Sequence, residues 1–477
     1  MKINVNIKNF LIYNFPVWIP VVVNFLIFPL YTNYLSPSDF GFRAIILLSI
    51  LILEILSNFG INWVIRARYF ELESYNEKKS FVSTILVFSF GLRIILYILF
   101  YYFGLHIFPF FFENWGPIHN ELFYLQLLIF FFGFSNEVFF ALYVLEKHSK
   151  QYSFAILLQY FIKIIISVVF LVIHNQGIHS LFYGDLIGVV IFQIFSFFYF
   201  SRYICLAFDK TVIKDLIKIG LPAMPKSLFE RIQLNIDQYI IQMFLPVFEL
   251  GIFARSQFIY NGALGLNKAF SNAFSPVYLE ETINNNREYS PKKIMLYWLF
   301  TLSLIIIFSA LFMVDVFRLI GVTEEFMICA KYAPLYSLNI LITSYVLMHG
   351  NNILISKSTY LYTIRSFFSG LINIILNIIL IPNYGILGAI AASLVSALVF
   401  FIIEYCFSEK YLGFNTDVVV FPFLLLIIMI IFIFYLVFNN LIVSLILKSI
   451  IFFSFTTILL IIDYFYIDDS IIKKLYR

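Results

Sequence analysis

The pattern of hydrophobic and polar positions divides the chain into long apolar segments separated by short polar ones. An apolar segment of about 20 residues is long enough to cross a bilayer as a helix. Fourteen such segments follow one another, near residues 10–34, 42–65, 80–103, 121–145, 152–173, 178–201, 217–245, 251–273, 294–317, 327–350, 359–381, 385–407, 418–438 and 441–463. The pattern therefore predicts an all-α polytopic membrane protein with 14 transmembrane helices.

The seventh segment, residues 217–245, differs from the others because polar side chains recur on two of its faces. The two faces carry Lys226, Glu230, Gln233 and Asp237, and Arg231, Asn235, Gln238 and Gln242. A charge at the bilayer centre costs roughly 2.5–3.5 kcal/mol, so neither face suits lipid. We expect this helix to border protein or a water-filled cavity. Two alternatives stay open: a soluble amphipathic helix, and structural ion pairs such as Lys226 with Glu230.

The composition excludes a soluble protein. Hydrophobic residues make up 62% of the chain and charged residues 12%, which is too little polar surface to coat soluble domains. The net charge of +4 is small and follows the membrane topology, so it indicates no nucleic-acid partner. The three cysteines are far apart and have no metal-site or disulfide spacing. The amino-terminal apolar run is longer than a signal peptide and is expected to stay as the first span.

Basic residues lie almost entirely on one side of the predicted topology. Twenty occupy the two ends and alternate loops, and the intervening loops hold only Arg318. The twenty are Lys2, Lys8, Arg66, Arg68, Lys78, Lys79, Lys147, Lys150, Arg202, Lys210, Lys214, Lys218, Arg287, Lys292, Lys293, Lys357, Lys410, Lys473, Lys474 and Arg477. By the positive-inside rule both termini are cytoplasmic, which requires an even number of helices.

Matches within the chain indicate a duplication. Residues 173–178 (IHNQGI) match 381–386 (IPNYGI), Tyr69 and Glu71 match Tyr278 and Glu280, and Gly41 matches Gly251, all at a spacing of 208 to 210. Six helices separate each pair, so the two copies have the same orientation and a pseudo-twofold axis along the membrane normal. We predict a six-helix lobe at 1–208, a second at 209–414, and two additional helices with a cytoplasmic tail at 415–477.

Four motifs then give the chain a resemblance to a known family. Residues 373–396 read NIILNIILIPNYGILGAIAASLVS. Residues 33–41 (NYLSPSDFG), 58–70 (NFGINWVIRARYF), and 219–225 (IGLPAMP) followed by 236–241 (IDQYII) occur in the same order as in that family. The chain resembles Wzx-type polysaccharide flippases of the multidrug/oligosaccharidyl-lipid/polysaccharide exporter superfamily over nearly its whole length. In the first motif, Pro382 and Gly385 are expected to end one helix and turn the chain, and small residues to pack the next helix closely.

The resemblance implies a function and partners. Such proteins move undecaprenyl-diphosphate-linked oligosaccharides from the cytoplasmic to the outer leaflet by alternating access, for O-antigen, capsule or related surface polysaccharide. The expected location is the cell inner (plasma) membrane, and the expected partners are the lipid-linked oligosaccharide, membrane lipid, a polysaccharide polymerase and a chain-length regulator. The expected role includes no covalent chemistry, so the chain is not expected to be an enzyme.

This cargo sets the chemistry required of the site. Its diphosphate needs cations and its sugars need amide or aromatic groups. The candidate substrate-binding residues are Lys226, Arg231, Arg255, Lys163, Arg43, Gln233 and Asn24. For Arg43 the alternative is snorkelling to the membrane face. No cofactor, metal or catalytic residue is expected.

Energy for transport is expected from an ion gradient or mass action, because the sequence has no nucleotide-binding motif. Among the acids within the predicted spans, Glu230 and Asp237 are the candidates for proton or sodium coupling. The alternative is that they neutralise Lys226 and Arg231.

Other functions remain open at this point. A lipid II flippase of the same superfamily ranks second, although its first helix is expected to be basic and residues 10–34 carry no charge. A drug exporter of the superfamily is third. A polytopic glycosyltransferase or polysaccharide polymerase would need a substantial outward loop, and the longest predicted outward connection is about residues 104–120.

Overall fold

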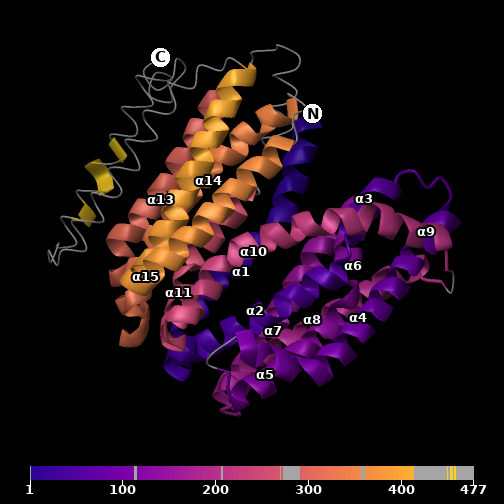
Figure 1. Ribbon diagram of the computed structural model, residues 1–477, viewed down its shortest axis with the longest axis horizontal. Coiled ribbons are helices and arrows are strands. Elements are labelled where there is room, and N and C mark those ends of the chain that lie inside the picture. The colour runs from indigo at the N-terminus through magenta and orange to yellow at the C-terminus, as the bar shows by residue number, and fades with distance from the viewer. Residues whose placement is uncertain are drawn as a thin grey trace. The chain divides into compact units, whose positions relative to one another are not determined.

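The computed structural model describes residues 2–111, 115–205, 208–268, 270–271, 291–355 and 360–412, with short helical pieces at 448–449, 452–454 and 456–457. Throughout these residues the secondary structure is helical, with no strand (Figure 1). Eight helical segments in this part are long and apolar enough to cross a membrane. They confirm the prediction of an all-α polytopic membrane protein.

The helices begin and end as follows: α1 Lys2–Tyr34, α2 Pro37–Asn58, α3 Ile61–Arg68, α4 Tyr75–Phe111, α5 Pro117–Phe132, α6 Asn136–Leu145, α7 Ser149–Val172, α8 His179–Tyr199, α9 Lys210–Asp215, α10 Leu221–Phe244, α11 Val247–Ser256, α13 Pro291–Ile320, α14 Met327–Ile355 and α15 Tyr360–Leu412. The described residues of the predicted spans up to residue 407 lie mainly on these helices or on the helical stretch 258–268, and the span at 42–65 is divided by the break between α2 and α3. The last two predicted spans lie outside the described residues except for the short pieces, so the count of fourteen stays a prediction.

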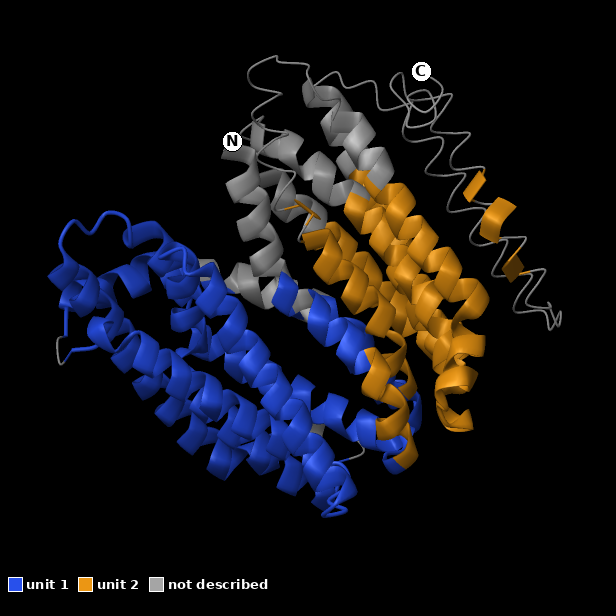
Figure 2. Ribbon diagram, turned by 180° about the vertical axis from the view of Figure 1, so that it is seen from behind, with its two compact units in different colours: residues 1–24, 34–251 blue, residues 25–33, 252–477 orange. Residues whose placement is uncertain are grey.

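The chain forms two compact units, shown separately coloured in Figure 2. Unit 1 contains residues 1–24 and 34–251, and unit 2 contains residues 25–33 and 252–477. These units are groups of residues that contact one another in space. The predicted boundaries at 208 and 414 were instead placed where the two copies of an internal duplication end. The two-lobe division and the symmetry axis therefore stay predictions.

Local sequence sets the start of α2 and its end. Ser36 and Asp39 cap the helix reciprocally: the Ser36 backbone N–H donates to Asp39 Oδ2 at 2.8 Å, and the Asp39 N–H to Ser36 Oγ at 3.3 Å. The helix ends where Phe59 and Gly60 take positive φ angles of 44° and 68°. This break separates α2 from α3 and directs α3 into the core of unit 1.

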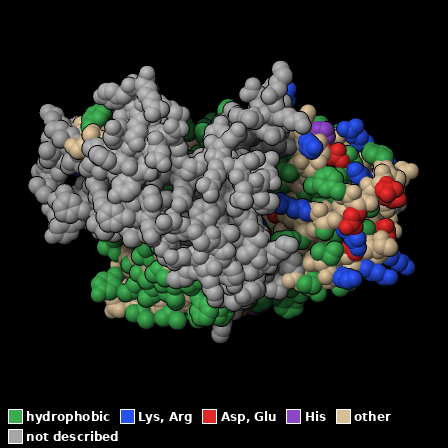
Figure 3. Space-filling view, turned by 90° about the horizontal axis from the view of Figure 1, so that it is seen from above, with side chains coloured by type: hydrophobic (Ala, Val, Ile, Leu, Met, Phe, Trp, Pro, Cys, Tyr) green, Lys and Arg blue, Asp and Glu red, His purple; other side chains and the backbone are tan. Residues whose placement is uncertain are grey.

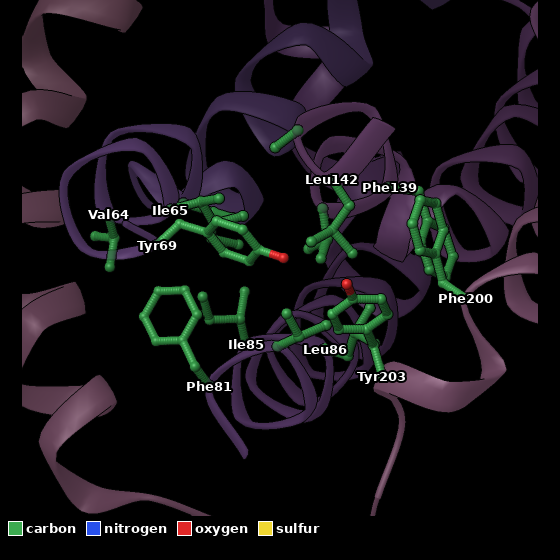
Figure 4. Packing of buried hydrophobic residues seen from close by; sticks show 14 of the residues in the cluster. Val64, Ile65, Tyr69, Phe81, Ile85, Leu86, Phe139, Leu142, Phe200 and Tyr203 are labelled. Carbon is green, nitrogen blue, oxygen red and sulfur yellow. The ribbon is translucent and has the colours of Figure 1, made fainter. Parts of the chain in front are cut away.

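One hydrophobic cluster in the core of unit 1 is drawn from α3, α4, α6, α7, α8, α9 and the residues between α8 and α10. Figure 4 shows residues of this cluster, with the hydroxyl groups of Tyr69 and Tyr203 pointing toward each other. Burial of such side chains contributes about 25 cal/mol for each Å² of apolar surface removed from water. The cluster fixes α3 and α6 at the end of the unit.

In unit 2, α15 is a helical hairpin whose two halves meet at Gly385. This residue has φ 58° and ψ −138°, values outside the helical region. The halves share a polar seam made of Ser369, Asn373, Asn377 and Ser396. Within it Ser369 Oγ donates to Ser396 O at 3.1 Å, and Asn373 Nδ2 to Ser396 Oγ at 3.2 Å.

Close packing beside the turn explains the small residues of the 373–396 motif. A β-carbon added to Gly388 would stand 2.3 Å from Leu380 O, and Ala389 and Ala392 are fully buried. The predicted turn between two closely packed helices is therefore confirmed, and the described residues of this motif form packing contacts.

Candidate functional site

A cluster of three ionic side chains joins three membrane-spanning helices of unit 1. Arg43 on α2 and Lys163 on α7 both contact Asp185 on α8. Arg43 Nη2 lies 2.5 Å from Asp185 Oδ2, and Lys163 Nζ lies 2.5 Å from Asp185 Oδ1. Each carboxylate oxygen therefore has its own cation. We call these three residues the Asp185 cluster.

Glycines on α8 bring Asp185 to Lys163. A β-carbon on Gly184 would stand 2.4 Å from Lys163 O, and one on Gly188 would stand 3.0 Å from Gln159 O and 3.2 Å from Lys163 Cβ. Without β-carbons at these positions, α8 approaches the backbone of α7 at the level of Lys163. The spacing of these glycines thus positions the carboxylate that neutralises one of the two cations.

The Asp185 cluster has more positive than negative charge. With ordinary ionisation its two cations and one carboxylate sum to one positive charge. The side chains of Arg43 and Asp185 are 14% and 15% exposed, whereas Lys163 is 38% exposed, so one cation of the cluster is open to its surroundings. The Arg43 guanidinium also lies over the Phe182 ring, 5.4 Å from its centroid. A site of this kind can bind an anion.

A second ionic group lies at the contact of α10 with α2. Arg231 Nη1 donates to Glu54 Oε2 at 3.2 Å, with both side chains about two-fifths exposed. The Tyr239 hydroxyl donates to Leu48 O at 2.7 Å and fixes the same two helices. The predicted polar face of the seventh segment therefore contacts α2 through Arg231.

A further arginine of unit 1, Arg93 on α4, is buried. Arg93 donates to Phe130 O, and its guanidinium lies 4.4 Å from the centroid of the Phe130 ring. The charges of Glu54 and Glu137 act on it, and Glu137 accepts a hydrogen bond from Asn62. Arg93 is thus held by protein contacts within unit 1, which agrees with a structural role.

Charged side chains gather over the end of unit 1 that carries α3 and α9 (Figure 3). There Arg68 binds Asp215 through two hydrogen bonds, Nε at 2.9 Å and Nη2 at 2.8 Å, and also contacts Glu71. The ion pair fastens α9, and with it the chain entering α10, to α3.

Beside this ion pair a carboxylate is held by two tyrosines. Burial alone would raise the pKa of Glu146, but hydrogen bonds from Tyr69 and Tyr203 and the charge of Lys78 lower it below its ordinary value. Burial and the same carboxylate raise the pKa of the Tyr69 hydroxyl far above its usual range. Glu146 is therefore ionised and Tyr69 protonated at neutral pH.

The structure brings some of the predicted site residues together and separates others. Arg43 and Lys163 meet at Asp185, whereas Arg231 pairs with Glu54. Asn24 is exposed on α1, Asp237 is buried on α10 and Arg255 is half-buried on α11 in unit 2. The side chains of Lys226, Glu230 and Gln233 lie outside the described residues, so their roles stay predictions.

The structure gives ionic contacts to two acids that the sequence analysis did not choose, Asp185 and Glu54. The coupling candidates chosen there, Glu230 and Asp237, stay predictions. The signal for Asp185 is local: a carboxylate one residue after Gly184 and three before Gly188 in an apolar segment. Glu54 has no comparable signal, because its partner Arg231 is 177 positions away.

Comparison with known proteins identifies the family of the chain. The sequence profile described as "Polysaccharide biosynthesis protein" matches residues 32–279, just over half of the chain. The chain belongs to this family. The matched residues include the Asp185 cluster, Glu54 and Arg231. No curated protein matches the sequence.

Solved structures of other membrane proteins have the same fold as this chain. A lipid II flippase MurJ in an inward closed conformation aligns with a TM-score of 0.65 and 17% identity over 95% of this chain and 97% of that one. An inward-facing multidrug resistance MATE family transporter of the MOP superfamily aligns with a TM-score of 0.62 and 15% identity over 85% and 96%. A MOP superfamily transporter from Pyrococcus furiosus gives 0.57 and 16% over the same shares. The chain is a multi-pass membrane protein with the MOP superfamily fold.

Proposed function

We propose that this protein flips undecaprenyl-diphosphate-linked oligosaccharide repeat units from the cytoplasmic to the outer leaflet, by alternating access, for O-antigen, capsule or a related surface polysaccharide. The observation that carries the proposal is the Asp185 cluster, a site with an unbalanced positive charge between three membrane-spanning helices. A diphosphate-bearing lipid is an anion that remains in the membrane, so it suits such a site.

Family membership supports the polysaccharide part of the proposal, and the fold supports the transport part. The family description names polysaccharide biosynthesis, and the solved structures with this fold are described as a flippase or as transporters. A flippase moves a lipid-linked intermediate without changing its covalent structure. The proposed partners are accordingly the lipid-linked oligosaccharide and membrane lipid, together with the polymerase and chain-length regulator that act on the translocated cargo.

Location and energy source complete the proposal. The proposed location is the inner (plasma) membrane, with both termini in the cytoplasm, an orientation that the distribution of basic residues supports. A proton or sodium gradient drives transport through an acid within the membrane, for which Glu230 and Asp237 are the candidates. Both acids belong to α10, the helix whose Arg231 contacts α2.

Transport in reconstituted vesicles tests the proposal. Purified protein is expected to move a fluorescent lipid-linked oligosaccharide between leaflets with no change in its mass, and an imposed proton or sodium gradient is expected to change the rate. Arg43→Gln and Lys163→Gln should reduce the rate, whereas Lys150→Gln, an exposed lysine at the start of α7, should not. A product with altered glycan length would favour a polymerase or glycosyltransferase instead.

The likeness to the MurJ fold makes lipid II the second candidate cargo. The same vesicles distinguish the two: preference for lipid II over other undecaprenyl-diphosphate-linked sugars would replace the proposed cargo. The uncharged segment 10–34 favours the first candidate, because a basic first helix is expected of a lipid II flippase.

A further inference from the structure

The Asp185 carboxylate bridges its two cations in the way that an anionic ligand would. Its two oxygens are each 2.5 Å from a different cation, one on α2 and one on α7. Arginine binds carboxylates and phosphates through the same donors, and lysine binds either as a point charge. The two basic side chains are therefore already arranged around an oxyanion, supplied by the protein itself.

The packing around Asp185 shows that this arrangement is built into the helices. Gly184 lets α8 approach Lys163 O and the hydroxyl of Ser167, and Phe182 supports the Arg43 guanidinium from the same helix. The exposed fraction of Lys163, 38%, is more than twice that of either other member. An incoming anion can therefore reach Lys163 first, while Asp185 still holds Arg43.

We propose that Asp185 is an internal substitute for the cargo's diphosphate, and that phosphate oxygens displace its carboxylate from Lys163 and Arg43 when cargo binds. This inference rests on the proposed function and gives the site its ligand class, a lipid-borne diphosphate. A diphosphate brings more negative charge than one carboxylate, and the cluster has one positive charge in excess to receive it.

Displacement has a mechanical consequence. Asp185 is the residue through which α8 makes ionic contact with both α2 and α7. When the cargo takes over the two cations, the ionic link between α8 and α2 is lost, whereas α8 stays packed against α7 and α5. A ligand shifts a conformational equilibrium only by its different affinity for the two states, and breaking this link supplies such a difference.

Removing the Asp185 carboxylate tests the proposal, which expects the affinity for a diphosphate to rise and not to fall. The probes are inorganic pyrophosphate and geranyl diphosphate, titrated calorimetrically into the purified full-length protein. Asp185→Asn is expected to tighten binding of both by about tenfold or more, because the competing negative charge is gone. Arg43→Gln and Lys163→Gln are expected to weaken it. Unchanged or weaker binding in Asp185→Asn would overturn the proposal, since a merely structural carboxylate gives that result.

A second pair of variants keeps the test decisive if Asp185→Asn does not fold. Asp185→Asn combined with Lys163→Gln keeps one net positive charge, and it is expected to bind pyrophosphate more tightly than Lys163→Gln alone. Equal affinity would overturn the proposal. Asp215→Asn is the matched control, because it removes the carboxylate of an Arg–Asp pair at the end of unit 1 and should leave diphosphate binding unchanged.

The two probes and the transport assay separate the possible failures. Tighter binding of geranyl diphosphate than of pyrophosphate supports a lipid-borne ligand, whereas the reverse order overturns the link to the cargo. Failure of the wild type and all variants to bind either probe overturns the inference. If Asp185→Asn binds the probes more tightly but the reconstituted protein flips no lipid-linked sugar, the proposed function fails and the anion site stands. If flipping occurs but Asp185→Asn does not tighten binding, the function stands and the inference fails.

Discussion

Gly41 and Gly251 pack backbone to backbone. A β-carbon on Gly251 would stand 2.9 Å from the Gly41 nitrogen and 1.8 Å from Pro37 O, and one on Gly41 would stand 2.0 Å from Val247 O. Gly41 lies near the start of α2, and Gly251 lies in α11. The two glycines are also a matched pair in the predicted duplication. The contact leaves no room for a side chain at either position.

A methyl group at this contact is expected to destabilise the protein. Gly41→Ala should lower the free energy of unfolding by about 1–3 kcal/mol, because the added atom overlaps backbone that cannot move aside. Thermal unfolding in detergent measures the change. Gly91→Ala is the control: no atom lies within 4 Å of its added β-carbon, so it should be neutral or slightly stabilising. Equal unfolding temperatures for the two variants would contradict the close contact.

Glu146 is expected to make stability depend on pH. Its pKa is lowered in the folded protein, so its contribution is fully present above the unfolded pKa of about 4.3 and is lost as the pH falls through the folded pKa. Glu146→Gln should therefore lose less stability than the wild type when the pH is lowered across this range. Unfolding temperatures measured at a series of pH values provide the test.

The control for Glu146 is Glu73→Gln, at an exposed acid near the same face. Its acid profile should follow that of the wild type. Parallel profiles for all three proteins would mean that the tyrosine hydrogen bonds do not distinguish the folded from the unfolded carboxylate.

Loss of Arg231 is expected to abolish export without preventing folding. The Arg231–Glu54 pair is about two-fifths exposed, and pairs of that kind stabilise by only about 0–1 kcal/mol. Arg231→Ala should insert and unfold nearly as the wild type does, whereas Arg231→Lys, which keeps the charge, should retain part of the export. Surface polysaccharide in cells reports export, and Arg66→Ala is an exposed control. A normal amount of surface polysaccharide in cells with Arg231→Ala would mean that Arg231 is not a substrate-binding residue.

The polar seam of α15 is expected to stabilise unit 2. Asn373→Ala removes the acceptor of Asn377 Nδ2, 3.0 Å away, and the donor to Ser396 Oγ. Hydrogen bonds between membrane helices contribute about 1–2 kcal/mol in peptides and less in proteins, so a loss of about 1 kcal/mol or more is expected. Asn383→Ala is the matched control, because that amide is exposed and bonds only within its own turn. An effect no larger than that of the control would mean that the seam adds nothing.

Much of the fold could be predicted from sequence because the length of an apolar segment is a property of that segment alone. The separation of residues 359–381 from 385–407 is confirmed at Gly385, whose backbone leaves the helical region, whereas Pro382, also expected to end the helix, lies inside it. The start of α2 at Ser36 and Pro37 is likewise set by neighbouring residues.

The candidate site was predictable only in part, because its members meet through tertiary contacts. Arg43 and Lys163 were identified one at a time, as cations in apolar segments. Their connection through Asp185 depends on how closely Gly184 allows α8 to approach α7, which no single segment specifies. Arg231 was likewise identified before its partner Glu54 could be.

The seam inside the α15 hairpin also constrains how unit 2 enters the membrane. The first half alone would lose the partner that the second half gives to the amide of Asn373 and to the hydroxyl of Ser369, and hydrocarbon offers no replacement. We therefore expect the two halves to enter the bilayer at lower cost as a paired hairpin than one after the other.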